Sequence, residues 1–204
     1  MFMSLDEMTQ VLAAAKKLSP SLYMFQSLLG FAGLRPSEAL SLKVSDVFYL
    51  GHIVTEIHLA PTNTKTRSGR DVPVPLPLKA AISHFLGEIG KTTPHDSWLL
   101  EGPLGKPFTI RAMQYSTRKL GFAVLHRIIT PKTFRHTYAT LLARVAPIRS
   151  VQAALGHASL QSTQVYTHPV ADDLQNAVHR LFDRVPSQDV PLPFAPTQYP
   201  EGKE

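Results

Sequence analysis

Residues 130–137 read Thr-Pro-Lys-Thr-Phe-Arg-His-Thr, and this stretch marks the beginning of a helix. Thr130 is suited to cap the helix, and Pro131 is suited to its first turn. Lys132 and Arg135 are three residues apart, so they share one face of that helix. Both lie in its first two turns, where the helix dipole disfavours cations. Two interpretations stay open at this point: an anionic partner at the helix start, or two tolerated surface cations.

Helical patterns lie on both sides of this stretch. A β-rich part interrupts the helical pattern that precedes it. Ser4-Leu5-Asp6-Glu7 predicts a capping box at the start of a helix over 5–18. Apolar spacing and Pro or Gly boundaries predict further helices over 22–32, from 36, and over 78–89, 109–120, 130–145, 147–155, 160–166 and 171–185. Short β-rich runs at 47–50, 53–59 and 71–74 predict one small sheet. The fold class expected is mainly α with a small antiparallel β-sheet (α+β).

Length and composition limit the protein classes. The chain has 204 residues, 44% of them hydrophobic, which suits one globular domain. It has no cysteine, which excludes disulfides, a thiol nucleophile and thiolate zinc sites. No apolar run is long enough to span a membrane, and the N-terminus does not resemble a signal peptide. We expect a domain over 1–185, a proline-rich and flexible tail over 186–204, and a cytoplasmic location.

The charge is unevenly distributed along the chain. The net charge is +6, and residues 102–171 contain nine basic residues and no Asp or Glu. Such a block favours a polyphosphate partner, although a basic face without a ligand remains possible. Nucleic acid is one such partner, and the candidate contacts to it within the block are Arg111, Arg118 and Lys119.

Two segments of the first half place cations at turns. Residues 33–40, Gly-Leu-Arg-Pro-Ser-Glu-Ala-Leu, put Arg35 directly before a helix start, with Glu38 within one turn of it. Residues 64–70, Thr-Lys-Thr-Arg-Ser-Gly-Arg, form a basic hairpin tip suited to a nucleic-acid groove. Its cations are Lys65, Arg67 and Arg70. Taken singly, each segment is more often an ordinary surface feature.

A histidine and a tyrosine follow the predicted helix over 147–155. His157 and Tyr166 are nine residues apart, so one continuous helix would put them on opposite faces. Gly156 can end the preceding helix in a left-handed conformation, which leaves His157 in a turn. A new short helix would then present Tyr166 near its far end. The two side chains could therefore converge.

Taken together, these segments resemble the tyrosine recombinase (phage integrase) family. The match follows the family's order: an arginine in Gly-Leu-Arg-x-Ser-Glu-Ala-Leu, a hairpin lysine before Val-Pro, Arg-His-Thr-x-Ala-Thr on a helix, and Leu-Gly-His followed by Tyr-Thr-His. It covers about residues 5–185. The resemblance implies the family's catalytic-domain fold, and DNA strand cleavage and rejoining through a 3′-phosphotyrosine without metal, ATP or other cofactor.

The resemblance also implies a role for each matching residue. Tyr166 corresponds to the nucleophile, Arg35 and Arg135 to the phosphate clamp, and Lys65 to the acid for the leaving oxygen. His157 and Lys132 would orient the phosphate and accept the tyrosine proton, and Glu38 would hold Arg35. Lys132 stands where the family most often has histidine.

The resemblance leaves other points as expectations. The chain begins at the catalytic domain, as in short single-domain members or a fragment, so we expect weak DNA affinity by itself. An apolar stripe over 171–185 would fold back in cis or dock on a neighbouring subunit, the latter assembling a tetramer on DNA. A type IB topoisomerase-like enzyme and a catalytically silent DNA-binding accessory protein are the alternative functions.

Overall fold

The computed structural model describes residues 2–60, 69–89, 94 and 96–156. The chain divides into two compact units, Met1–Thr167 and His168–Glu204, and every described residue belongs to the first. The helices expected over 160–166 and 171–185 and the tail over 186–204 lie outside the described residues.

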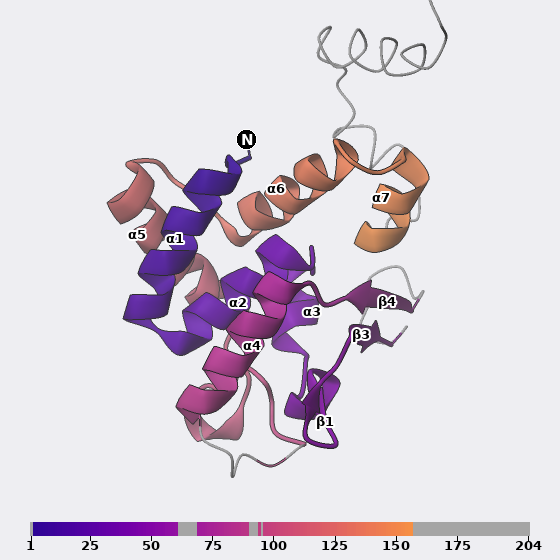
Figure 1. Ribbon diagram of the computed structural model, residues 1–204. Coiled ribbons are helices and arrows are strands. Elements are labelled where there is room, and N and C mark those ends of the chain that lie inside the picture. The colour runs from indigo at the N-terminus through magenta and orange to yellow at the C-terminus, as the bar shows by residue number, and fades with distance from the viewer. Residues whose placement is uncertain (1, 61–68, 90–93, 95, 157–204) are drawn as a thin grey trace, which may run out of the picture. The chain divides into compact units, whose positions relative to one another are not determined.

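The described unit is mainly helical, with two small antiparallel sheets (Figure 1). Its α-helices are α1 (Leu5–Leu18), α2 (Pro20–Phe31), α3 (Pro36–Leu40), α4 (Leu76–Ile89), α5 (Ile110–Leu125), α6 (Pro131–Ala143) and α7 (Ile148–Leu155). Its strands are β1 (Phe48–Tyr49), β2 (His52–Ile53), β3 (Glu56–Leu59) and β4 (Arg70–Pro73), and 3₁₀ turns lie at Val44–Asp46 and Pro103–Gly105.

Local capping explains where several helices begin. Ser4 accepts a hydrogen bond from the Glu7 amide, and the Glu7 carboxylate accepts one from the Ser4 amide, so the expected capping box is confirmed. Thr130 caps α6, and Pro131 is its first residue, also as expected. Thr109 caps α5, which continues five residues beyond the predicted end at Leu120.

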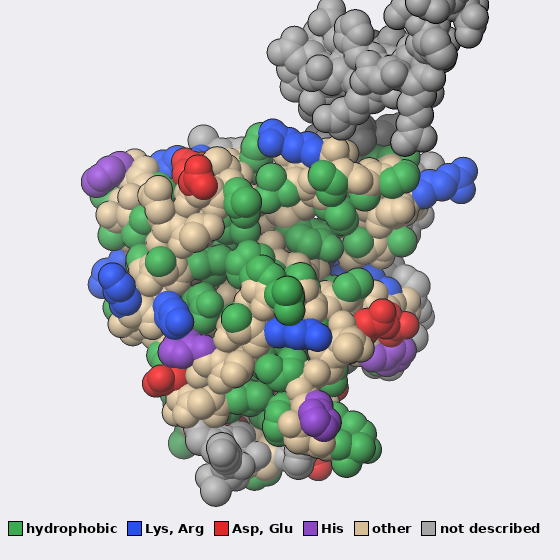
Figure 2. All heavy atoms as spheres, in the orientation of Figure 1, with side chains coloured by type: hydrophobic (Ala, Val, Ile, Leu, Met, Phe, Trp, Pro, Cys, Tyr) green, Lys and Arg blue, Asp and Glu red, His purple; other side chains and the backbone are tan. Residues whose placement is uncertain are grey.

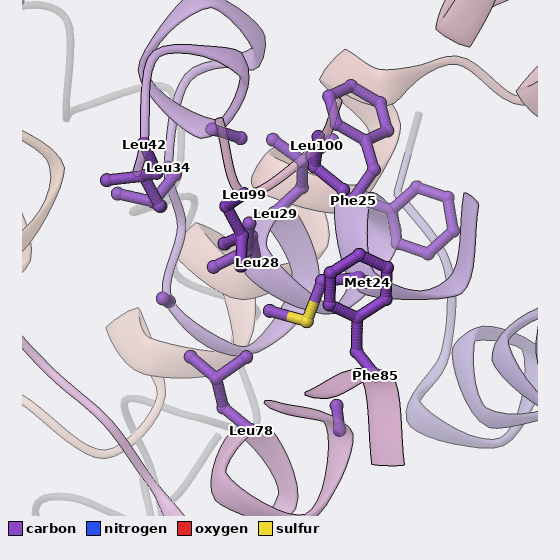
Figure 3. Packing of buried hydrophobic residues seen from close by; sticks show 14 of the residues in the cluster. Met24, Phe25, Leu28, Leu29, Leu34, Leu42, Leu78, Phe85, Leu99 and Leu100 are labelled. Carbon is purple, nitrogen blue, oxygen red and sulfur yellow. The ribbon is translucent and has the colours of Figure 1, made fainter. Parts of the chain in front are cut away.

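The core is built around α2, whose side chains are buried on nearly all sides. Met24, Phe25, Leu28 and Leu29 are fully buried in it. Figure 3 shows them facing residues of α4 and of the segments that follow α2 and precede α5, among them Leu34, Leu42, Leu78, Phe85, Leu99 and Leu100. A helix that is apolar all round needs neighbours on each side, and α1, α4, α5 and α6 pack against α2.

The β-rich part differs from the single sheet that the sequence predicts. β1 pairs with β2, and β3 pairs with β4, in two separate two-stranded sheets. The chain changes partner at residues 54–55: the Val54 amide donates to Val47, whereas the Thr55 carbonyl accepts from Val74. The predicted strand over 53–59 is therefore divided between two partners.

The last described helices lead back to β4. α6 packs across α2, and α7 packs against α6 through Ala139, Val151 and Leu155. The end of α7 lies beside β4 (Figure 1). Gly156 ends α7 in the left-handed conformation expected of it, with φ of 59°.

The surface is varied in the view drawn in Figure 2. Hydrophobic side chains occupy much of this face, and Lys and Arg lie at separate places on it. Among the described residues, no helix has the length and hydropathy needed to cross a membrane.

Candidate active site

Glu38 lies on α3, and its side chain is fully buried. Arg35 immediately precedes this helix and has an extended backbone, as expected of a residue before proline. The Arg35 amide donates to Glu38 Oε2 at 2.7 Å, and Arg35 Nη1 donates to Oε1 at 2.7 Å. The carboxylate therefore caps the start of α3 and holds the Arg35 guanidinium at the same time.

Arg70 at the start of β4 binds the same carboxylate from another side. Its Nη1 lies 2.9 Å from Glu38 Oε1, and its Nη2 lies 2.8 Å from Oε2. This is the paired arrangement that makes Arg–carboxylate contacts strong and directional. The Arg70 side chain is only 8% exposed. The sequence predicts Arg70 as an exposed DNA contact, whereas in this structure its guanidinium is directed inward, at Glu38.

Arg135 on α6 completes the group. Its Nη1 donates to the Gly33 carbonyl, its Nη2 donates to the Leu155 carbonyl at 2.7 Å, and its Nη1 lies 4.0 Å from Glu38 Oε2. Three segments far apart in sequence thus bring their arginines to one carboxylate. We call Arg35, Glu38, Arg70 and Arg135 the Glu38 cluster.

The electrostatics of the Glu38 cluster follow from its burial and its charges. Burial alone would raise the pKa of Glu38, but hydrogen bonds from Arg70 and Arg35 and the charge of Arg70 lower this pKa to about 2. Glu38 is therefore ionised at neutral pH. Within these four side chains, three positive charges face one negative charge, so the cluster favours an anion such as phosphate.

The end of α7 is tied to the cluster through backbone carbonyls. Arg35 Nη2 donates to the Gly156 carbonyl at 2.8 Å, and Arg70 Nε donates to the Ala154 carbonyl at 3.1 Å. The last carbonyls of a helix have no partner inside it, so these arginines satisfy them. A Cβ on Gly156 would lie 2.7 Å from Arg70 Nη1, so glycine is needed here for space as well as for its backbone conformation.

Gly33 shapes the site from the other side. Its φ is 63°, and a Cβ there would lie 2.3 Å from Cδ1 of Tyr138. The Tyr138 ring on α6 therefore packs directly on the residue whose carbonyl binds Arg135. Burial raises the pKa of Tyr138, and the nearby charges of Arg70 and Arg135 oppose this rise. Tyr138 is a neighbour of the cluster that the motifs do not reveal.

The predicted catalytic and orienting residues divide into three groups, the last of which also includes the candidate DNA contact Arg67. Arg35, Glu38 and Arg135 come together as the resemblance implies. Lys132 is exposed on α6, although Arg135 three residues later is buried. The remaining predicted residues of the site, which are Lys65, Arg67, His157 and Tyr166, lie outside the described residues.

The other candidate DNA contacts lie on α5. Arg111 and Arg118 are exposed and two turns apart, so they share one face of this helix. Lys119 is also exposed, and it lines a groove between α1 and α5 together with Lys17 and Tyr115. DNA contact by these three side chains remains a prediction.

Burial and a neighbouring cation act together on His136 of α6. Burial lowers the pKa of His136, and the positive charge of Lys132 lowers it further. Within the described part of the chain, no three His, Asp or Glu side chains gather in a way that could hold a metal ion.

Comparison with known proteins identifies the fold and the family. Residues 1–172 match the model of the phage integrase family. The chain belongs to this family. The matched region includes all four members of the Glu38 cluster as well as His157 and Tyr166, and the predicted resemblance to this family is confirmed.

Individual relatives and structures agree with this membership. The chain is 40% identical over 143 residues to tyrosine recombinase XerC of Methylobacterium nodulans, covering 69% of this chain and 43% of that protein. It is 35% identical over 159 residues to tyrosine recombinase XerA of Pyrococcus furiosus, covering 75% and 52%. A crystal structure of XerA recombinase matches with a TM-score of 0.71 and 27% identity, covering 89% of this chain and 63% of that one.

The fold also matches that of more distant recombinases. A XerH site-specific recombinase bound to palindromic difH substrate superimposes with a TM-score of 0.68 at 23% identity, covering 88% of this chain and 52% of that one. The expected mainly α catalytic-domain fold is confirmed by these structures. The chain spans about half the length of the curated relatives that it matches.

Proposed function

We propose that this protein is a site-specific recombinase that cleaves and rejoins DNA strands through a 3′-phosphotyrosine intermediate. The observation that carries the proposal is the Glu38 cluster, in which two arginines that match the family's phosphate clamp share a buried carboxylate. Family membership supplies the reaction class, and the buried arginines supply a means of stabilising its transition state.

Cleavage begins with the tyrosine. The Tyr166 hydroxyl oxygen attacks the scissile phosphorus and forms a new P–O bond, while the bond to the 5′ oxygen breaks. His157 and Lys132 orient the phosphate and accept the tyrosine proton, and Lys65 donates a proton to the departing 5′ oxygen. An ammonium can supply this proton, whereas an arginine guanidinium cannot.

The reverse reaction rejoins the strand. A 5′-hydroxyl attacks the phosphotyrosine, which breaks the bond to Tyr166 and restores a phosphodiester. The covalent intermediate conserves the energy of the cleaved bond, so no ATP is required. We propose no metal ion or other cofactor in either step.

The arginines act on the phosphate rather than on the proton. Negative charge grows on the non-bridging oxygens as the pentavalent state forms, and fixed guanidinium groups stabilise that charge. The Arg35 side chain is 17% exposed and that of Arg135 is 9% exposed. Their positions are set before DNA arrives, by Glu38 and by the carbonyls of Gly33, Leu155 and Gly156.

Tyr166→Phe is the direct test, because it removes only the hydroxyl. We expect covalent DNA–protein adducts on a nicked duplex to disappear while folding and DNA binding persist. Tyr49→Phe is the matched control, since Tyr49 is an exposed tyrosine on β1. The duplex can be selected from a randomised pool by adduct formation. Adducts formed by Tyr166→Phe at the normal rate would overturn the assignment.

The same assay separates the alternative functions. A catalytically silent accessory protein forms no adduct even with the natural sequence. A topoisomerase-like enzyme forms adducts and relaxes supercoils, but it does not exchange strands between two sites. Recombination of a two-site plasmid therefore supports the proposed function over both alternatives.

We also propose that the chain works on double-stranded DNA as a tetramer assembled through residues 171–185, at a DNA-associated location in the bacterial cytoplasm. Apolar Leu174, Val178, Leu181 and Phe182 recur there at helical spacing, and such a stripe needs a surface to cover it. Deleting residues 171–204 should abolish two-site recombination and leave adduct formation on one nicked duplex. Normal recombination by the truncated protein would contradict docking on a neighbouring subunit.

A further inference from the structure

We propose that Arg70 is a positioning residue that fixes the start of β4, the strand that follows Lys65 in the sequence, against the Glu38 cluster. The inference rests on the proposed function, because it concerns the proton donor of that reaction. The sequence alone suggests a different role for Arg70, namely an exposed contact at a basic hairpin tip.

The inward direction of Arg70 is part of the strand pattern. Side chains alternate between the two faces of a strand, so Arg70 shares a face with Val72. Val72 is buried, whereas Asp71 and Pro73 between and beyond them are exposed. On the neighbouring strand β3, Arg70 is paired with Leu59, which is buried as well. Arg70 therefore takes the place that an apolar residue would take in this strand.

Three hydrogen bonds use most of the Arg70 guanidinium. Two go to the Glu38 carboxylate at 2.9 and 2.8 Å, and the third goes from Nε to the Ala154 carbonyl at 3.1 Å. The first two tie β4 to α3, and the third ties β4 to the last turn of α7. A lysine has one nitrogen in place of this planar fork, so it cannot make all three contacts.

Arg35 and Arg70 both bond to Glu38 and to the end of α7. Among the described residues, Arg70 is the one that does so from β4, the strand that follows Lys65. Lys65 precedes it by five residues, and His157 follows Gly156 directly. Arg35 is held independently of Arg70, by its own bonds to Glu38 and to the Gly156 carbonyl. Loss of the Arg70 fork should therefore disturb the proton donor more than the phosphate clamp.

The chemistry of the leaving group can separate these two effects. When sulfur replaces the bridging 5′ oxygen, the leaving group is a thiolate. Thiols have a pKa near 8.5, so a thiolate departs without a proton from the enzyme. The phosphate clamp is still needed for this substrate. A variant defective only in proton donation is therefore slow on the oxygen substrate and is rescued on the sulfur substrate.

The experiment measures single-turnover adduct formation by the full chain on two nicked duplexes that differ only in this atom. The duplex sequence is the one selected by adduct formation with the natural protein. The variants are Arg70→Lys, Lys65→Ala, Arg35→Lys and Arg127→Lys. Arg127 is the control, because it also binds a carboxylate through its guanidinium but lies outside the cluster.

Arg70→Lys should be at least about tenfold slower than the natural protein on the oxygen duplex and should regain most of that loss on the sulfur duplex. Lys65→Ala should behave in the same way, Arg35→Lys should be slow on both, and Arg127→Lys should resemble the natural protein. Because both rates come from the same preparation, their ratio does not depend on the fraction that is folded.

Two results would overturn the positioning role: an Arg70→Lys rate equal to that of the natural protein on oxygen, or an equal loss on both substrates. If the natural protein selects no duplex from the randomised pool by adduct formation, the proposed function fails and the role of Arg70 fails with it. If Arg70→Lys is rescued and Lys65→Ala is not, Lys65 is not the acid, and the proposal that Arg70 acts on the strand that follows Lys65 is wrong while the clamp stands.

Discussion

Two Arg–Glu pairs in this protein have the same contact distance but different surroundings. Arg70 Nη2 lies 2.8 Å from Glu38 Oε2, and Arg127 Nη2 lies 2.8 Å from Glu7 Oε2. The side chains of the first pair are 8% and 0% exposed, and those of the second are 25% and 35% exposed. The distance alone therefore does not distinguish a buried organising contact from a partly solvated one.

The difference in exposure indicates that the Glu7 and Glu38 carboxylates have different roles. Glu7 caps α1 through the Ser4 amide and accepts Arg127 as an additional partner. Glu38 has lost its water, so only its hydrogen bonds and the nearby arginine charges keep it ionised. If Glu38 is neutralised, buried arginines lose their anion. If Glu7 is neutralised, water can solvate Arg127, which is partly exposed.

The largest expected effect is on the free energy of unfolding of Glu38→Gln. Removing one partner of a buried ion pair costs about 3–5 kcal/mol, because the remaining charge stays buried. Glu7→Gln should cost no more than about 1 kcal/mol, since glutamine can still cap the helix and the lost pair is partly solvated. Urea unfolding at neutral pH measures both. Equal losses would show that the buried and solvated carboxylates do not differ in this way.

Acid should reveal the same contrast in the natural protein. The pKa of Glu38 is about 2 in the folded chain, against an ordinary value of 4.5. A lowered pKa stabilises the fold above pH 4.5, and this contribution is lost as the pH falls toward 2. The full loss is about 3 kcal/mol by the usual conversion. The unfolding free energy of Glu38→Gln should depend less on pH over this range, and an unchanged pH slope would contradict the account.

The smallest expected effect concerns Arg127→Lys. A solvated pair that keeps its charge should change the unfolding free energy by less than about 1 kcal/mol, and salt should reduce the change further. Arg70→Lys provides the comparison in the same urea titrations. A loss at Arg127 that equals the loss at Arg70 would remove the distinction between the two pairs.

Much of the fold could be predicted because its signals are local. The Ser4–Glu7 capping box, Pro131 at the start of α6 and Gly156 at the end of α7 each depend on residues close in sequence. The division of the β-rich part into two sheets could not be predicted in the same way. It depends on Val54 and Thr55 turning to different partners, and the composition of that run does not encode this choice.

The site was predicted from ordered motifs, and its contacts depend on long-range packing. Arg35, Glu38 and Arg135 meet as the motifs imply, but their carbonyl partners at Gly33, Leu155 and Gly156 come from the packing of helices. Arg70 was assigned to an exposed turn, although its two-residue spacing from Val72 already favoured the buried face. The alternation of buried and exposed positions along the strand indicated an inward Arg70, but the positive charges of the segment favoured the interpretation as an exposed turn.

The central claim is that the arginines around Glu38 clamp the scissile phosphate, and the rate of adduct formation by Arg35→Lys tests it most directly. This variant keeps the charge and loses the fork. Removing one preorganised donor to a transition-state oxygen slows chemistry by about 10²–10³-fold, so we expect a loss of that size on a nicked duplex with saturating protein. Arg127→Lys should react at the natural rate in the same assay. A loss of less than about tenfold in Arg35→Lys would contradict the clamp and leave Arg35 a role in placing the DNA alone.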